Sequence, residues 1–130
     1  MYLNRAKVEN FRGFHRINIA FETTTVLIGE NNYGKTSLLD ILQICLGYRA
    51  DGGGFPFRPR DFRRADGHED TSPQPIKVSL NFRERGVRER SPWRRSKLRK
   101  VFTDGPRRSL QLVLKVTATL EPKSERINVR

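Results

Sequence analysis

The sequence predicts an α/β fold in which mixed and antiparallel strands surround one buried helix. Apolar and polar residues alternate in several short segments, and a glycine-rich segment separates an apolar run from a helical pattern. At 130 residues the chain has room for one domain with a modest core. We expect strands, a glycine-rich loop and a helix over 1–47, a loop over 48–75, and antiparallel strands over 76–130.

Three short strands are expected before the glycine-rich segment, over Leu3–Val8, His15–Ala20 and Thr24–Ile28. A turn at Asn10–Gly13 separates the first two. The third strand ends in the apolar run Val26–Ile28, which is typical of a strand covered on both faces.

A helix is expected over Thr36–Leu46, ended by Gly47. Apolar residues occupy nearly all of its sides, so we expect it to be buried between two layers. Its residue Cys45 is the single cysteine of the chain, which excludes an internal disulfide and fits a reducing cytoplasm.

The second half begins with a loop rich in glycine and proline, followed by two strictly alternating segments, Ile76–Phe82 and Leu110–Leu120. Two antiparallel strands are the simplest interpretation. The connection over 83–108 holds eleven arginines and lysines against three acidic residues, and contributes much of the net charge of +12. Trp93 and Phe102 are interleaved there, a pattern that favours single-stranded nucleic acid, although a mobile hairpin connection explains it equally well.

The glycine-rich segment has the spacing Gly-x-x-x-x-Gly-Lys-Thr of a phosphate-binding P-loop, and it falls between an apolar strand and a helix, as that motif requires. Its backbone N–H groups and the helix N-terminus would hold phosphates, Lys35 would reach the β- and γ-phosphates, and the Thr36 hydroxyl would bind Mg²⁺. We therefore predict Mg-ATP as ligand. The candidate nucleotide-binding residues are Gly29, Glu30, Asn31, Asn32, Tyr33, Gly34, Lys35, Thr36 and Ser37.

Hydrolysis needs an acidic residue at the end of an apolar strand, and the sequence after Thr36 has none. Asp40 falls inside the expected helix and Asp61 in polar loop sequence. His15 and His68 have no partner at metal-ligand spacing. We assign no catalytic residue and expect nucleotide binding without turnover.

The segments Val8–Phe14 and Thr25–Asp40 resemble the start of an OLD-family (overcoming lysogenization defect) ATP-dependent endonuclease, whose ATPase head belongs with the ABC, SMC and RecF class. The similarity is close over 1–47 and thins after residue 84. It implies the N-terminal lobe of an ABC-type P-loop ATPase, with the turn that holds Arg12 beside the nucleotide, so that Arg12 would contact phosphate or base.

Full-length relatives go on to a signature segment, a Walker B acid and a Toprim nuclease domain, so the resemblance implies an N-terminal fragment. It also implies DNA as a partner, and a homodimer or a further C-terminal part that completes the site. No segment of the sequence is apolar enough for a signal peptide or a membrane span, and we expect a soluble, cytoplasmic protein without a membrane partner.

Two alternatives stay open at this point. The first is a basic nucleic-acid-binding protein that works through 83–108 and keeps a vestigial nucleotide site. The second is a small P-loop kinase or related α/β NTPase, which would need a parallel βαβ sheet.

Overall fold

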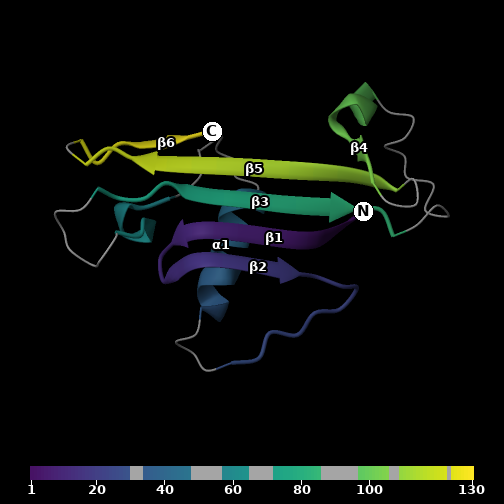
Figure 1. Cartoon of the computed structure of the whole chain (residues 1–130), viewed down its shortest axis with the longest axis horizontal. Helices are drawn as coiled ribbons and strands as arrows, with labels where there is room; N and C mark the ends of the chain where they lie inside the picture. The colour runs from purple at the N-terminus through teal and green to yellow at the C-terminus, as the bar shows by residue number, and fades with distance from the viewer. Residues whose placement is uncertain (30–33, 48–56, 65–71, 86–96, 106–108, 123) are drawn as a thin grey trace.

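The computed structural model describes residues 1–29, 34–47, 57–64, 72–85, 97–105, 109–122 and 124–130. They form a six-stranded sheet with one α-helix packed on one of its faces (Figure 1). The elements are β1 (Tyr2–Phe11), β2 (Phe14–Ala20), α1 (Lys35–Leu46), the 3₁₀ helix η1 (Pro59–Asp61), β3 (Ile76–Arg83), the 3₁₀ helix η4 (Lys97–Val101), β4 (Thr103–Asp104), β5 (Leu110–Leu120) and β6 (Ile127–Val129).

The strands follow the order β2-β1-β3-β5-β4, with β6 paired to the other end of β5. Every named ladder among the described residues is antiparallel. The strands expected at 3–8, 15–20, 76–82 and 110–120 are present, whereas the short β4 and β6 were not expected. The described sheet therefore offers no support for the kinase alternative, which requires parallel strands.

The core lies between the sheet and α1. Alternate residues of the three central strands point to this side and are buried, as the period of two predicts. Figure 1 looks onto the opposite side of the sheet, with α1 behind the strands. The central members of the core are Ala6, Val8, Ile76, Val78, Leu80, Val116 and Ala118 from the sheet and Leu38, Ile41 and Cys45 from α1.

Helix α1 is covered on one side only, so the expectation that it lies between two layers is wrong for the described structure. Leu38, Ile41 and Cys45 form its buried stripe, while Leu39 and Leu46 are 58% and 47% exposed. The apolar composition of the helix exceeds what one sheet can cover. No helix in the described ranges is long and apolar enough to cross a membrane.

The third expected strand, over Thr24–Ile28, is also absent. Residues Val26–Ile28 take no strand assignment, and the side chains of Val26 and Ile28 are 74% and 91% exposed. A strand needs a neighbour to accept and donate its backbone hydrogen bonds, and no described segment pairs with this one. The apolar run therefore has a sequence typical of a strand but has no partner strand in the described structure.

The expected loop over 48–75 contains ordered structure in its middle. Phe57 and Phe62 are buried, η1 lies between them, and an antiparallel bridge joins Phe62 to Phe11 at the end of β1. This part of the chain therefore packs against the turn that follows β1.

The two ends of the basic connection over 83–108 are joined by hydrogen bonds where β3 ends and β5 begins. The buried Glu84 carboxylate accepts a hydrogen bond from the Leu110 amide at 2.8 Å, and the Glu84 amide donates to the Leu110 carbonyl at 3.1 Å. Phe102 is buried, so it is not available to stack on a base. Trp93 and most of the arginines of this connection fall outside the described residues.

Burial of Cys45 makes stability depend on alkaline pH. Burial raises the pKa of the Cys45 thiol from 9.0 to about 11. Between these values the unfolded thiol loses its proton and the folded one keeps it, so the free energy of unfolding falls as pH rises, by roughly 3 kcal/mol at most. Urea unfolding at pH 8 and pH 10.5 should show a smaller loss for Cys45→Ala than for the wild type. Equal losses would contradict this assignment.

Candidate functional site

The site is built on the N-terminus of α1. The helix begins at Lys35, directly after Gly34, and its first internal hydrogen bond runs from the Leu38 amide to the Gly34 carbonyl at 2.9 Å. No side chain caps this end, and its first turn holds no acidic residue. The amides of residues 35–37 therefore lack an acceptor within the helix, and together with the helix dipole they favour an anion.

Gly34 is required where it lies for two reasons. Its φ of 85° is in the left-handed region that residues with a side chain rarely adopt. In addition, a Cβ at this position would overlap the ring of Phe14, at the start of β2. The end of the P-loop segment thus rests directly on the β1–β2 turn.

The Lys35 side chain folds back along this segment, and its Nζ donates a hydrogen bond to the carbonyl oxygen of Gly29. This contact brings the first glycine of the motif to the lysine six positions later. Lys35 and Ser37 are half-buried and Thr36 is exposed. The predicted residues Gly29, Gly34, Lys35, Thr36 and Ser37 therefore lie together, while Glu30, Asn31, Asn32 and Tyr33 fall outside the described residues.

These residues fit a Mg²⁺ ion that is coordinated jointly by the protein and by a bound nucleotide. The described chain holds no group of three His, Cys, Asp or Glu side chains that could bind a metal ion by themselves. Mg²⁺ in nucleotide sites is held by few protein ligands plus phosphate oxygens and waters. The exposed Thr36 hydroxyl on the first turn of α1 can supply such a ligand.

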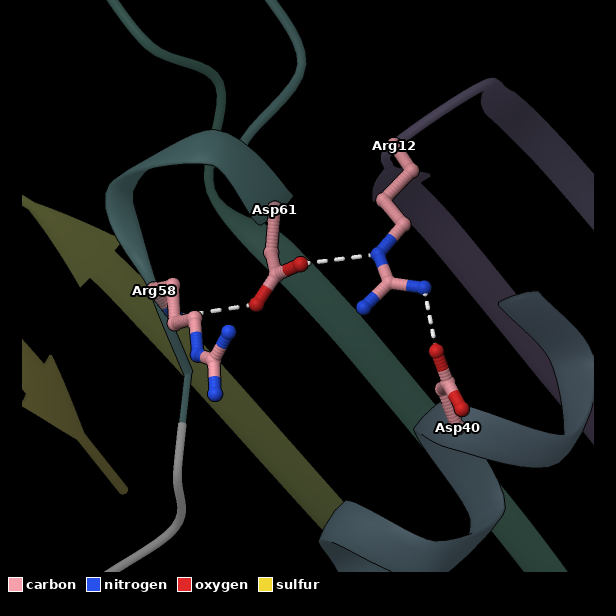
Figure 2. A network of polar contacts seen from close by, with 4 residues as sticks. All are labelled: Arg12, Asp40, Arg58 and Asp61. Carbon is pink, nitrogen blue, oxygen red and sulfur yellow. Dashed lines mark hydrogen bonds and ion pairs between the residues drawn. The ribbon is translucent and has the colours of Figure 1, made fainter. Parts of the chain in front are cut away.

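Arg12 lies beside this helix and bridges two carboxylates from other elements (Figure 2). Its Nε donates to Asp61 Oδ1 at 2.8 Å, and its Nη1 donates to Asp40 Oδ2 at 2.5 Å. Asp61 Oδ2 accepts from the Arg58 amide at 2.9 Å. The side chain of Asp61 is only 1% exposed, against 29% for Arg12 and 37% for Asp40. The guanidinium therefore joins the β1–β2 turn, η1 and α1.

The turn that carries Arg12 has an unusual backbone. Asn10 and Arg12 have φ values of 58° and 49°, in the left-handed region that costs about 1 kcal/mol per residue for side chains other than glycine. The neighbouring segment holds both in place. The Arg12 amide donates to the Asp61 carbonyl at 2.8 Å, and the Asn10 side chain donates to the Pro75 carbonyl at 3.0 Å.

The charge of Arg12 is fixed by this setting. Burial by itself would lower the pKa of the guanidinium, but hydrogen bonds and charge from Asp61 and Asp40 outweigh burial and raise that pKa above its ordinary value. Contact between Arg12 and a nucleotide stays a prediction, since the structure places the guanidinium on these two carboxylates. No role for Asp61 could be predicted from the sequence, because nothing in a polar loop signals a buried ion pair.

Comparison with known proteins gives a family and a fold. The family model described as "Protein of unknown function (DUF2813)" matches residues 1–129. The "Uncharacterized protein YbjD" of Escherichia coli (strain K12) is 36% identical over 89 residues, which are 65% of this chain and 15% of that protein. The match thus spans about one-seventh of this longer relative.

The fold is similar to that of a solved structure described as "Structural biochemistry of ATP-driven dimerization and DNA stimulated activation of SMC ATPases". The TM-score is 0.51 at 15% sequence identity, and the alignment covers 100% of this chain and 69% of the other. An antiparallel, sheet-dominated fold like that of an SMC ATPase is therefore established, while the resemblance to OLD endonucleases stays a prediction.

Proposed function

This chain belongs to the DUF2813 family, and from that premise we propose that it is the nucleotide-binding module of an OLD-like ATP-dependent DNA endonuclease, with Mg-ATP as ligand. The observation that carries the proposal is the uncapped N-terminus of α1 behind Gly34, with the Lys35 ammonium held over the Gly29 carbonyl. Bare amides and one cation at a helix start are what a triphosphate needs.

Each residue of this site has a part in the proposed binding. The backbone N–H groups of the P-loop and of residues 35–37 would donate to phosphate oxygens, and Lys35 would exchange Gly29 for the β- and γ-phosphates. The Thr36 hydroxyl would bind Mg²⁺, which neutralises phosphate charge when it is bound. Ser37 lies on the same first turn and adds a second hydroxyl beside the phosphates.

The similarity to an SMC ATPase supports the wider part of the proposal. The description of that structure names ATP-driven dimerization and DNA-stimulated activation of SMC ATPases. We propose that residues 1–130 are part of an ABC-type ATPase domain, that two copies or a further part of the protein complete the site, and that DNA is a partner. The endonuclease activity rests on the resemblance of Val8–Phe14 and Thr25–Asp40 to OLD proteins.

We expect this chain alone to bind ATP without hydrolysing it. Asp40 lies on α1 and Asp61 ends η1, and Arg12 forms an ion pair with each of them. A carboxylate in such an ion pair is not free to orient an attacking water. We therefore propose that turnover needs a catalytic acid that Asp40 and Asp61 do not supply.

Calorimetric titration with Mg-ATP and Mg-AMP tests the proposal. A site that reads the β- and γ-phosphates should bind Mg-AMP about 100-fold more weakly, which corresponds to about 2.7 kcal/mol. Removal of Mg²⁺ by EDTA should weaken ATP binding as well. Equal affinity for ATP and AMP would show that the P-loop does not hold the outer phosphates.

A further inference from the structure

The sheet face opposite α1 is strongly basic. Strand residues alternate between the two faces, so the neighbours of the buried core residues point away from α1 and are exposed. We call this side the outer face; it is the side turned toward the viewer in Figure 1. Its exposed cations are Arg5, Lys7, Arg16, Lys77, Lys115 and Arg130.

The register spaces these cations apart. Lys7 and Lys115 both pair with Ser79, one on each side of β3, so about 10 Å separates their backbones. Arg5 pairs with Asn81. Lys77 pairs with Glu9 on one side and with Thr117 on the other, and Thr117 exchanges backbone hydrogen bonds with Arg130. No two cations face one another directly, an arrangement that limits their repulsion within the sheet.

Most of these cations have no ion-pair partner among the residues that the structure describes. Arg16 forms an ion pair with Glu9 at 3.2 Å, and Glu121 lies past the end of β5, where hydrogen bonds from Ser124 and Asn128 lower its pKa. No ion pair joins Lys7, Lys77 or Lys115 to a carboxylate in the described part of the chain. The ammonium groups of Lys7, Lys77 and Lys115 are thus exposed to solvent, with hydroxyl and amide groups between them and one carboxylate, that of Glu9, opposite Lys77.

We propose that the outer face binds the sugar-phosphate backbone of duplex DNA. Lysine, serine, threonine and asparagine side chains are typical phosphate contacts, and the ladders place all four types here. Single strands are instead held by bases stacked on aromatic rings, and the register places no aromatic ring between Lys7, Lys77 and Lys115. An anionic membrane would favour a surface with several exposed apolar side chains. Among the described residues in the central part of this face, Val113 is the one large apolar side chain that is exposed, which argues against a membrane.

This inference rests on the proposed function for its partner and names the surface that DNA would meet. It places that surface on β1, β3 and β5, across the sheet from the P-loop helix. It also differs from the hypothesis that the connection over 83–108 is the working surface. The two binding activities are measured separately, so one can fail without the other.

A matched pair of triple variants tests the outer face. The first variant carries Lys7→Gln, Lys77→Gln and Lys115→Gln, which keep a long polar side chain at each position and remove three positive charges. The control carries Arg60→Gln, Lys97→Gln and Lys100→Gln, three exposed cations of η1 and η4 that lie outside the sheet. Fluorescence anisotropy with a labelled 20-base-pair duplex over a series of salt concentrations gives affinity and salt dependence, and Mg-ATP titration and thermal unfolding accompany each variant.

We expect the outer-face variant to bind the duplex at least about 10-fold more weakly than the control, with a log–log salt slope shallower by about 1 for each lysine that contacts a phosphate. Its Mg-ATP affinity and melting temperature should equal those of the wild type. Equal loss in both variants, loss in the control alone, or tighter wild-type binding to a single strand or to anionic vesicles would overturn the proposal. If the wild type does not bind Mg-ATP but the DNA results are as expected, the nucleotide-binding proposal is wrong and the proposal for the outer face still holds.

Discussion

Lys35→Ala should weaken Mg-ATP binding by about 100- to 1000-fold. In the proposed site the Lys35 ammonium would contact the outer phosphates, and charge-assisted hydrogen bonds of this kind contribute about 1.5–3 kcal/mol each. In the free chain the same ammonium bonds to the exposed Gly29 carbonyl, so its removal should change the free energy of unfolding by less than about 1 kcal/mol. Affinity should thus fall while the melting temperature stays nearly constant.

The control for this prediction is Lys7→Ala, which removes the same charge from the opposite side of the sheet and should leave Mg-ATP affinity unchanged. A second variant, Thr36→Ala, should reduce the dependence of binding on Mg²⁺. Unchanged affinity in Lys35→Ala, measured by calorimetry on folded protein, would show that the P-loop assignment is wrong.

Arg12→Ala should destabilise the fold by about 3 kcal/mol. The substitution leaves the buried Asp61 carboxylate with the Arg58 amide as its described partner, and an uncompensated buried charge costs about 3–5 kcal/mol in well-buried pairs. The partial exposure of Arg12 places this case at the lower end of that range. Urea unfolding followed by circular dichroism measures the change.

A double-mutant cycle separates the pair from its setting. Asp61→Ala should cost a similar amount, and the double variant Arg12→Ala with Asp61→Ala should cost clearly less than the sum, because no charge is then left buried. Asp40→Ala is the matched single control, since its carboxylate is 37% exposed and should contribute less than about 1 kcal/mol. Additive costs for Arg12 and Asp61 would show that the two side chains are not coupled.

The strands at 76–83 and 110–120 could be predicted because strict alternation of apolar and polar residues matches a sheet with one covered face. Their antiparallel pairing also agrees with the simplest interpretation. The prediction that α1 is buried on both sides was wrong. Composition indicates how much apolar surface a helix carries and not how many layers are present to cover it.

The site was predictable where backbone geometry has a sequence signature. Gly34 and Lys35 follow from the spacing of the motif, and the structure adds that Gly34 also makes room for Phe14. The role of Asp61 had no such signature, because its carboxylate meets Arg12 across 49 positions of sequence and becomes important only through burial. Long-range ion pairs of this kind have no local period that a single sequence can reveal.

The strand order determines how long the first strand of the nascent chain waits for its partner β3. β1 pairs with β3, and roughly 65 residues must leave the ribosome between them, which takes about 3–13 s at about 5–20 residues per second. During that interval the apolar sides of β1 and α1 are translated and have no β3 or β5 to cover them. The speed of translation through the intervening stretch therefore decides how long this apolar surface stays uncovered.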